Sequence, residues 1–458
     1  MHRTYSFKEK VTLFFMILWP IVVTQVVLYA MNLFDTMMSG QAGTHDLAGA
    51  AIGSSIWMPI FTGMNGILMA VTPIVSQFIG GGQHHKIAES VTQALYLSLL
   101  LAAAVLAAGV IFLEPLLSMM NLDPAVHHIA KHYLIGLSFG IIPLFAAHVL
   151  RYFFDAQGYT RITMIIILIA LPFNIALNYI LIFGKLGAPR LGGIGAGYAT
   201  SATYWLILLI SIMITFKVHA LYKYGLFVKW FSPSTKAWKE QLAIGVPMGL
   251  SVFFEASIFA VVTLLVGMMF DTVTVAAHQA AINFTSLLFM IPLSVSMALT
   301  IVVGFEVGGK RFADAKQYSR FGVITAIGFI AAASVFLYLY REGIAHFYTD
   351  NPDVITLVKQ FLIFAIFYQL SDAAQASLQG VLRGYKDVTI PFITALISYW
   401  GIGIPVGYGL ASFTSLGAFG FWLGITIGLT CASLGFFIRW MILQKRLAGK
   451  VPCHESKM

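Results

Sequence analysis

The sequence predicts an all-α integral membrane protein with twelve transmembrane helices, in two six-helix lobes related by a parallel internal repeat. Three observations predict this fold: an apolar composition, twelve long apolar runs, and short motifs that recur at a nearly constant offset. Of the 458 residues, 59% are apolar and 10% are charged. A soluble domain carries roughly 25% charged residues. Lipid must therefore cover much of the surface, and a soluble fold is excluded.

Each of the twelve runs is long enough to cross a bilayer, which takes about 20 mostly apolar residues. The first six spans are expected near 11–39, 47–79, 91–113, 129–151, 161–183 and 191–216. The second six are expected near 240–268, 274–304, 316–340, 355–381, 388–411 and 417–443. The second and eighth runs are long enough to tilt or bend.

The distribution of Lys and Arg predicts the orientation. With twelve spans both termini lie on one side, and the termini and connections of that side hold about 22 of the 27 Lys and Arg. Basic residues favour the cytoplasmic face, so both termini are expected to be cytoplasmic in a cell (plasma) membrane protein. The predicted parts are an N-terminal lobe (1–216), a basic cytoplasmic linker (217–239), a C-terminal lobe (240–447) and a cytoplasmic tail (448–458).

Short motifs recur in the same order in the two halves. The segment around Pro20 (LWPIVVTQ) matches the segment around Pro247 (GVPMGLSV), and QGYTR (157–161) matches RGYKD (383–387). Because each half holds an even number of spans, both halves have the same orientation. Such parallel repeats are typical of transporters, whose substrate sites lie near the bilayer midplane.

Three carboxylates lie inside apolar runs: Asp35, Glu255 and Asp372. Charged groups within a membrane are costly and mark functional sites by default. No basic residue lies in the interior of the runs that hold Glu255 and Asp372, so each acid would take up a proton or coordinate a cation. A structural, hydrogen-bonded carboxylate is the alternative for these two. For Asp35, near the outer end of its span, the alternative is an interfacial acid.

Polar side chains accompany these acids at helical spacing. The set around Asp35, with the amide and hydroxyl oxygens of Asn174, Asn178 and Thr200, would suit a small hard cation such as Na⁺. Interhelical hydrogen bonding is the alternative for these residues, and core packing for His278. The side chains expected to line a cleft are Gln25, Tyr29, Asn32, Ser251, His278, Gln279, Asn283 and Gln375.

Several motifs exclude other classes of protein. The segment GFEVGGKR (304–311) nearly forms a phosphate-binding loop, but Arg311 replaces the Ser or Thr that Mg²⁺ needs, and the segment ends an apolar run. The glycine-rich runs at 192–197 and 401–409 predict close helix packing. The basic residues lie in short connections and form no patch for nucleic acid. With no nucleophile–base pattern either, we expect neither an enzyme nor a bound cofactor.

The chain resembles the multidrug and toxic compound extrusion (MATE) family, in its NorM-like branch, over about residues 8–447. The resemblance is carried by Pro20, FDTMMSG (34–40), the QGYTR and RGYKD pair, FFEAS around Glu255, and YQLSDAAQ (368–375). It implies an antiporter that expels organic cations while Na⁺ or H⁺ enters.

The resemblance also implies two cation sites. In the C-terminal lobe the site would comprise Glu255 and Asp372 with Tyr368 beside them, and in the N-terminal lobe Asp35, Asn174, Asn178 and Thr200. The presence of all these residues favours Na⁺, with H⁺ left open. The expected partners are organic cations and the lipid bilayer, and one two-lobe chain would suffice as a monomer. The alternatives are a flippase for lipid-linked saccharides and a membrane channel or scaffold. The acidic midplane favours cationic cargo over the flippase.

Overall fold

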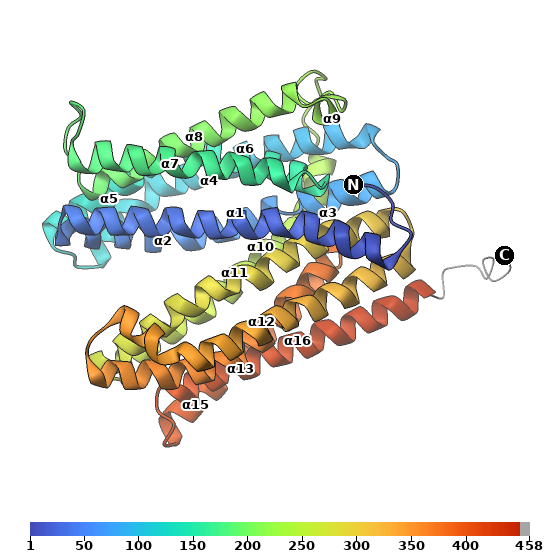
Figure 1. Cartoon of the computed structure of the whole chain (residues 1–458). Helices are drawn as coiled ribbons and strands as arrows, with labels where there is room; N and C mark the ends of the chain where they lie inside the picture. The colour runs from blue at the N-terminus through green and yellow to red at the C-terminus, as the bar shows by residue number, and fades with distance from the viewer. Residues whose placement is uncertain (449–458) are drawn as a thin grey trace. The chain divides into compact units, whose positions relative to one another are not determined.

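The computed structural model describes residues 1–448, and the side chains of residues 1–447, as helices joined by short connections (Figure 1). Beyond its first residue, the predicted tail at 448–458 lies outside the described residues. Within the described chain, eleven helices are long and apolar enough to cross a membrane. The bent pair α5–α6 supplies a twelfth span if it is counted as one.

The helices of the first half follow the predicted runs closely. They are α1 (Phe7–Ala42), α2 (Thr44–Leu68), α3 (Val71–Gly80), α4 (His85–Met119), α5 (Pro124–Ser138), α6 (Ile141–Ala156), α7 (Thr160–Phe183), α8 (Gly193–Lys217) and the short α9 (His219–Tyr222).

The second half has the same pattern of long helices. They are α10 (Thr235–Met269), α11 (Thr272–Gly308), α12 (Phe312–Tyr348), α13 (Pro352–Gly384), α14 (Thr389–Leu396), the π-helical segment η1 (Ile397–Gly403), α15 (Ile404–Phe413) and α16 (Phe419–Ala448). Polar caps begin several of them. Asp271 accepts a hydrogen bond from the Thr274 amide at α11, and Asn351 accepts one from the Asp353 amide at α13.

The fourth predicted span is not one straight helix, because α5 and α6 meet at an angle of 50°. A side chain of α8 contacts the backbone at this bend. Ser201 donates to the backbone oxygens of Gly136 and Leu137, at 2.6 and 3.0 Å. These carbonyls belong to the last turn of α5. The Gly140 amide donates to the Leu137 carbonyl at 2.9 Å, so the serine supplies the donor that the Gly136 carbonyl would have had from Gly140 in a continuous helix. Gly140 lets α8 approach, since a Cβ there would overlap the backbone of Ser201.

The second and eighth spans, both predicted to be long enough to bend, differ. The second is interrupted at Met69 and Ala70, between α2 and α3. Pro73 follows in the first turn of α3, where its missing N–H costs no helical hydrogen bond. The eighth, α11, runs unbroken for 37 residues across Pro292.

The chain forms two compact units. Unit 1 comprises Met1, Trp19–Ile79 and Gln83–Gly249, and unit 2 comprises His2–Leu18, Gly80–Gly82 and the chain from Leu250. In unit 1, α8 packs against α5, α6 and α7, and α2 packs against α5. In unit 2, α13 is central and packs against α11, α12 and α16.

The glycine-rich run at 401–409 packs closely against α16, as the sequence predicts. A Cβ at Gly424 of α16 would overlap the backbone of Gly407 and of Gly403. The run at 192–197 behaves in the same way in unit 1, where a Cβ at Gly197 would overlap the carbonyl of Tyr133. Both runs are therefore contact points between helix backbones.

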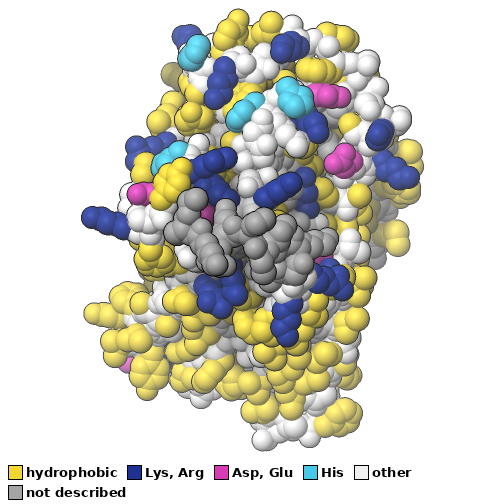
Figure 2. Space-filling model, turned by 90° about the vertical axis from the view of Figure 1, so that its right-hand side faces the viewer, with side chains coloured by type: hydrophobic (Ala, Val, Ile, Leu, Met, Phe, Trp, Pro, Cys, Tyr) yellow, Lys and Arg dark blue, Asp and Glu magenta, His cyan; other side chains and the backbone are white. Residues whose placement is uncertain are grey.

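Lys and Arg side chains gather on the face shown in Figure 2, which is the end of the helices at which the N-terminus lies in Figure 1. This clustering follows from the charge bias of the connections in the sequence. The side of the bilayer on which this face lies stays a prediction.

Candidate cation sites in the two units

The candidate site in unit 1 is built around Asp35 of α1. Its Oδ1 accepts a hydrogen bond from Asn178 Nδ2, and its Oδ2 accepts one from Thr200 Oγ1 at 3.1 Å. Asn178 Nδ2 also donates to Asn174 Oδ1 at 3.1 Å, one turn away on α7. Helices α1, α7 and α8 thus bring together the four residues that the sequence grouped.

An acceptor in this cluster is left over. Asn178 Oδ1 is buried and has no hydrogen-bond partner among the described residues. A buried polar atom without a partner costs about 1–3 kcal/mol. Together with the carboxylate of Asp35 and the Oγ1 of Thr200, it offers the oxygen ligands that a hard cation prefers.

The other polar residues of α1 have different surroundings. Asn32 is exposed, and Thr36 donates to the backbone oxygen of Asn32 at 3.0 Å. Tyr29 is half-buried. Gln25 accepts a hydrogen bond from Arg151 Nη2 at 3.3 Å. The stripe along α1 therefore contributes to two places in unit 1.

The second of these places is a buried ion pair that the sequence pattern did not reveal. Arg151 Nε lies 3.6 Å from Asp155 Oδ2, one turn further along α6. Asp155 Oδ1 accepts from Thr163 Oγ1 of α7 at 2.7 Å. The spacing of four residues between a base and an acid at the end of the fourth run is the signal that could have identified the pair.

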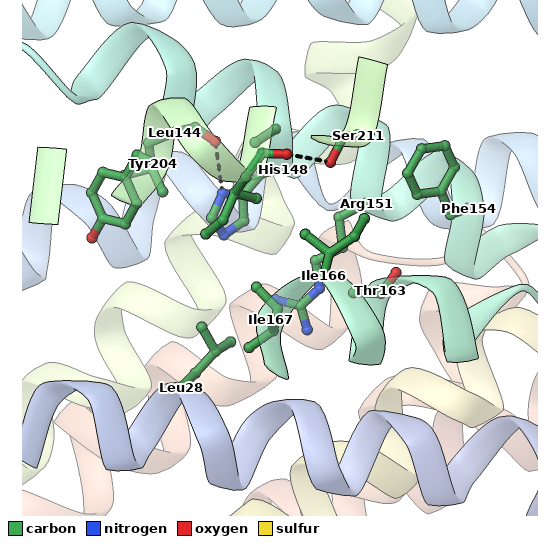
Figure 3. A pocket seen from close by; sticks show the side chains of 12 residues that line it. Leu28, Leu144, His148, Arg151, Phe154, Thr163, Ile166, Ile167, Tyr204 and Ser211 are labelled. Atoms are coloured by element: carbon green, nitrogen blue, oxygen red, sulfur yellow. Dashed lines mark hydrogen bonds between the residues drawn. The ribbon is translucent and has the colours of Figure 1, made fainter. Parts of the chain in front are cut away.

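A small cavity of about 50 Å³ adjoins Arg151 in unit 1. In Figure 3 the guanidinium of Arg151 lies beside Ile166 and Ile167. His148, whose Nδ1 is bonded to the Leu144 carbonyl oxygen at 2.8 Å, also lines the cavity. Pockets for drug-sized molecules measure roughly 300–1,000 Å³. This cavity has room for water but not for such a molecule.

The candidate site in unit 2 lies on α13, where four polar residues at helical spacing are all buried: Tyr368, Asp372, Gln375 and Gln379. Asp372 Oδ1 has no hydrogen-bond partner within the described chain, and the same is true of both amide atoms of Gln375. The hydroxyl of Tyr399, in η1, is also buried without a partner there, and it interacts electrostatically with Asp372. This cluster therefore holds several polar atoms that the described residues do not satisfy.

Glu255 joins this cluster from α10. It interacts electrostatically with Asp372 and lies beside Gln375. The interiors of the two predicted runs hold no base, but a base from the end of α13 lies near these acids. Arg383 is buried in the last turn of α13, donates to Gln379 Oε1 at 2.7 Å and interacts electrostatically with Glu255. Because α13 extends to Gly384 rather than to 381, the polar stripe continues for one more turn and includes this arginine.

Tyr368 and His278 belong to an adjoining, well-bonded network. The Tyr368 hydroxyl accepts from Gln369 Nε2 at 3.2 Å, and its ring meets the Trp422 ring edge to face at 5.4 Å. Trp422 Nε1 donates to His278 Nδ1 at 3.0 Å, so the remaining proton of a neutral His278 is on Nε2, 3.0 Å from Thr263 Oγ1. Both ring nitrogens of His278 have partners, which fits a packing role.

The other candidates of unit 2 lie elsewhere on α10 and α11. Ser251 is buried one turn before Glu255. Gln279 and Asn283 are exposed, one turn apart on α11. Within the described residues no three His, Cys, Asp or Glu side chains come close enough to hold a metal ion. Any cation bound at these sites would therefore be held by one or two carboxylates with amide, hydroxyl or backbone oxygens.

Comparisons with known proteins agree with this architecture. The sequence pattern of the MatE family matches residues 20–180 and 247–409, one stretch in each half. The chain is 53% identical over 450 residues to the "Probable multidrug resistance protein NorM" of Bacillus subtilis, covering 98% of this chain and 99% of that protein. A protein of the same name from Halalkalibacterium halodurans is 52% identical over 444 residues, with 97% and 96% covered.

A solved structure shows the same fold. The crystal structure of a MATE protein in its straight conformation matches with a TM-score of 0.87 at 19% identity, over 96% of this chain and 97% of that chain. This likeness supports the twelve-helix, two-lobe fold that the sequence predicts.

Proposed function

Because the chain belongs to the MatE family of membrane transporters, we propose that it is a multidrug efflux antiporter that exports organic, mostly cationic compounds in exchange for Na⁺. H⁺ is the alternative coupling ion. One chain, working as a monomer in the plasma membrane with both termini in the cytoplasm, would suffice.

The observation that carries this proposal is the presence, in each unit, of a carboxylate beside buried acceptor atoms that no described residue satisfies. In unit 1 the acceptor is Asn178 Oδ1 beside Asp35, and in unit 2 it is Asp372 Oδ1 beside Gln375. Isolated buried charges and acceptors are costly unless a proton or cation offsets them. A transported cation, which is a co-substrate and not a resident cofactor, would fill these positions in part of the cycle.

The proposed mechanism is alternating access. When the transporter is open to the outside, a coupling cation binds its carboxylates. The affinity of the transporter for cargo then falls in that state. Export is driven only if binding of the cation weakens binding of the cargo, and the reverse. The coupling free energy between two such sites is typically about 1–3 kcal/mol. Each ligand shifts the equilibrium only by its difference in affinity for the two states.

The test uses proteoliposomes that hold the purified chain and a fluorescent organic cation. Movement of the dye is followed after a Na⁺ gradient is imposed at fixed pH, and then after a pH gradient without Na⁺. The Asp35→Asn and Asp372→Asn variants are measured in parallel. Transport that is driven by Na⁺ and lost in the variants supports the proposal.

The other outcomes separate the alternatives. If the pH gradient alone drives the dye, H⁺ is the coupling ion and the Na⁺ assignment falls. If neither gradient moves it, the antiporter proposal fails, and lipid-linked saccharide flipping is tested next. Counterflow of labelled cation against excess drug separates a carrier from a channel, since a channel shows none.

A further inference from the structure

An open groove of about 690 Å³ lies within unit 2, away from the carboxylate cluster. It runs between the start of α12 and the end of α16, and Leu378 of α13 lies at its base. This volume falls within the range of ligand sites, roughly 300–1,000 Å³. None of its lining residues belongs to the proposed cation site.

The part of the groove further from the helix ends is an apolar wall of Ile324, Phe437 and Met441, with residues from both α12 and α16. These side chains are 70%, 42% and 40% exposed. They belong to helices that are long and apolar enough to span the membrane, so lipid acyl chains are the natural neighbours of this wall.

The part nearest the start of α12 and the end of α16 is a basic mouth of Lys316, Arg320 and Lys445. None of the lining residues is acidic, and within the described chain no acid forms an ion pair with these three bases. The acids of the neighbouring segments are already paired: Asp314 with Lys10, Glu306 with Arg311, and Asp387 with Arg439. The mouth therefore keeps its positive charge available for an anion.

One side chain that lines the groove, Trp440, carries a buried donor without a partner. Trp440 is 6% exposed, and its Nε1 has no hydrogen-bond partner among the residues that the structure describes. A buried tryptophan N–H usually finds an acceptor. Another lining residue, Ser319, is already satisfied, because its Oγ donates to the Ala315 carbonyl at 2.7 Å. Because Nε1 is itself buried, an acceptor on a bound molecule would reach it only after a shift of the neighbouring side chains.

We propose that this groove binds an anionic phospholipid. The phosphate lies against the basic mouth, an acyl chain lies along the apolar wall, and Trp440 Nε1 donates to an ester or phosphate oxygen. The site is amphiphilic in the order that a lipid requires, with the charge at the helix ends and the apolar surface toward the span. Clusters of Lys and Arg beside a membrane attract anionic lipids by about a factor of five for each charge.

The experiment measures lipid binding to the intact, detergent-purified chain by native mass spectrometry. Phosphatidylglycerol and phosphatidylcholine with identical acyl chains are compared over a range of concentrations. The test variants are Lys316→Gln/Arg320→Gln/Lys445→Gln and, separately, Trp440→Phe, which removes the donor but keeps an aromatic ring. The matched control is Lys229→Gln/Lys236→Gln/Lys239→Gln, which removes three exposed charges from unit 1. Thermal unfolding establishes that each variant is folded.

We expect phosphatidylglycerol to bind wild type and the control variant more tightly than phosphatidylcholine. The triple mouth variant should lose about 100-fold in phosphatidylglycerol affinity. Trp440→Phe should lose about fivefold, which is one hydrogen bond.

Three kinds of result would overturn the proposal. The first is equal binding of the two lipids, or undiminished phosphatidylglycerol binding by the folded mouth variant. The second is full displacement of the lipid by millimolar inorganic phosphate, since the site would then recognise a phosphate group alone. The third is lipid binding only by a chain ended after Ala448, which would identify the segment 449–458 as the occupant.

Discussion

Asp372 has one carboxylate oxygen that is buried and accepts no hydrogen bond from the described residues. If this oxygen receives the coupling cation or a proton, a neutral amide cannot replace it. We expect Asp372→Asn to reduce gradient-driven dye transport in proteoliposomes to the level of empty vesicles. The membrane insertion and the unfolding temperature of this variant should stay close to those of wild type, because the amide is similar in size to the carboxylate that it replaces.

The matched control is Asp353→Asn, on the same helix but exposed in its first turn. A change there alters only a favourable interaction with the helix dipole, worth about 0.3–1 kcal/mol, so transport should persist. Wild-type transport by Asp372→Asn would remove this residue from the mechanism.

Arg383 provides a positive charge that competes with any cation bound at Glu255. Removing it should strengthen cation binding, because a positive charge near a carboxylate typically weakens the affinity of that carboxylate for a cation by tenfold or more. We expect Arg383→Gln to lower the Na⁺ concentration for half-maximal thermal stabilisation about tenfold. Arg383→Lys keeps the charge and should lie between that variant and wild type. An unchanged Na⁺ dependence in a folded Arg383→Gln protein would show that the arginine serves only to hold Gln379.

At the scale of helices, the sequence predicts the existence of the spans well and their internal geometry poorly. Length and apolarity alone located all twelve runs, because a bilayer demands uninterrupted apolar helices. At the bend between α5 and α6 the backbone is contacted by Ser201, a residue of another helix, and no pattern within 129–151 encodes that contact. The sequence places Arg383 just past the end of a predicted run, but not its interaction with Glu255, because Glu255 belongs to another helix and α13 continues to Gly384.

The candidate sites show the same division. Spacing along one helix grouped Asp372 with Gln375, and Asn174 with Asn178, because residues three or four apart share a face. Spacing cannot join residues of different helices, so the grouping of Asp35 with Asn178 rested on their chemistry and on the family resemblance. The distance of Gln25 from Asp35 follows from helix geometry, since ten residues of α1 span about 15 Å. The partner of Gln25 could not be predicted, because it depends on where Arg151 of α6 lies.

The close packing of α15 on α16 makes a prediction at the level of a helix pair. Gly424→Ala places a methyl group against the backbone of Gly407, where neither helix can move without losing other contacts. Such overpacking typically costs about 1–3 kcal/mol. We expect a lower unfolding temperature in detergent. Gly409→Ala is the control, because a Cβ at that position meets nothing within 4 Å. Equal unfolding temperatures for the two variants would contradict the proposed contact.

At the scale of the whole molecule, the two halves share a framework but not a site. In unit 1 an acid of the first span, Asp35, is completed by α7 and α8. In unit 2 an acid of the corresponding first span, Glu255, is grouped instead with residues of α13. The repeat therefore explains the arrangement of helices, while the polar residues of each unit have to be established separately.

The predicted orientation is testable on the intact chain. With Cys431 and Cys453 replaced by Ser, single cysteines are introduced at the exposed Ser232, between α9 and α10, and at the exposed Ser415, between α15 and α16. A membrane-impermeant maleimide added to intact cells should label Ser415→Cys and spare Ser232→Cys, because basic connections favour the cytoplasm. Permeabilised cells should label both. The reverse pattern in intact cells would place the termini outside.

The polar face of α13 also has a consequence for biogenesis. A charged residue at the centre of a helix opposes its transfer from the translocon into lipid by about 2.5–3.5 kcal/mol, and α13 carries the buried Asp372 and, nearer its end, Arg383. In the folded chain these groups face protein, since α13 packs against α11, α12 and α16. During synthesis α11 and α12 emerge first and α16 last. The nascent α13 must therefore leave the translocon alongside α11 and α12, and wait for α16 to close its remaining side.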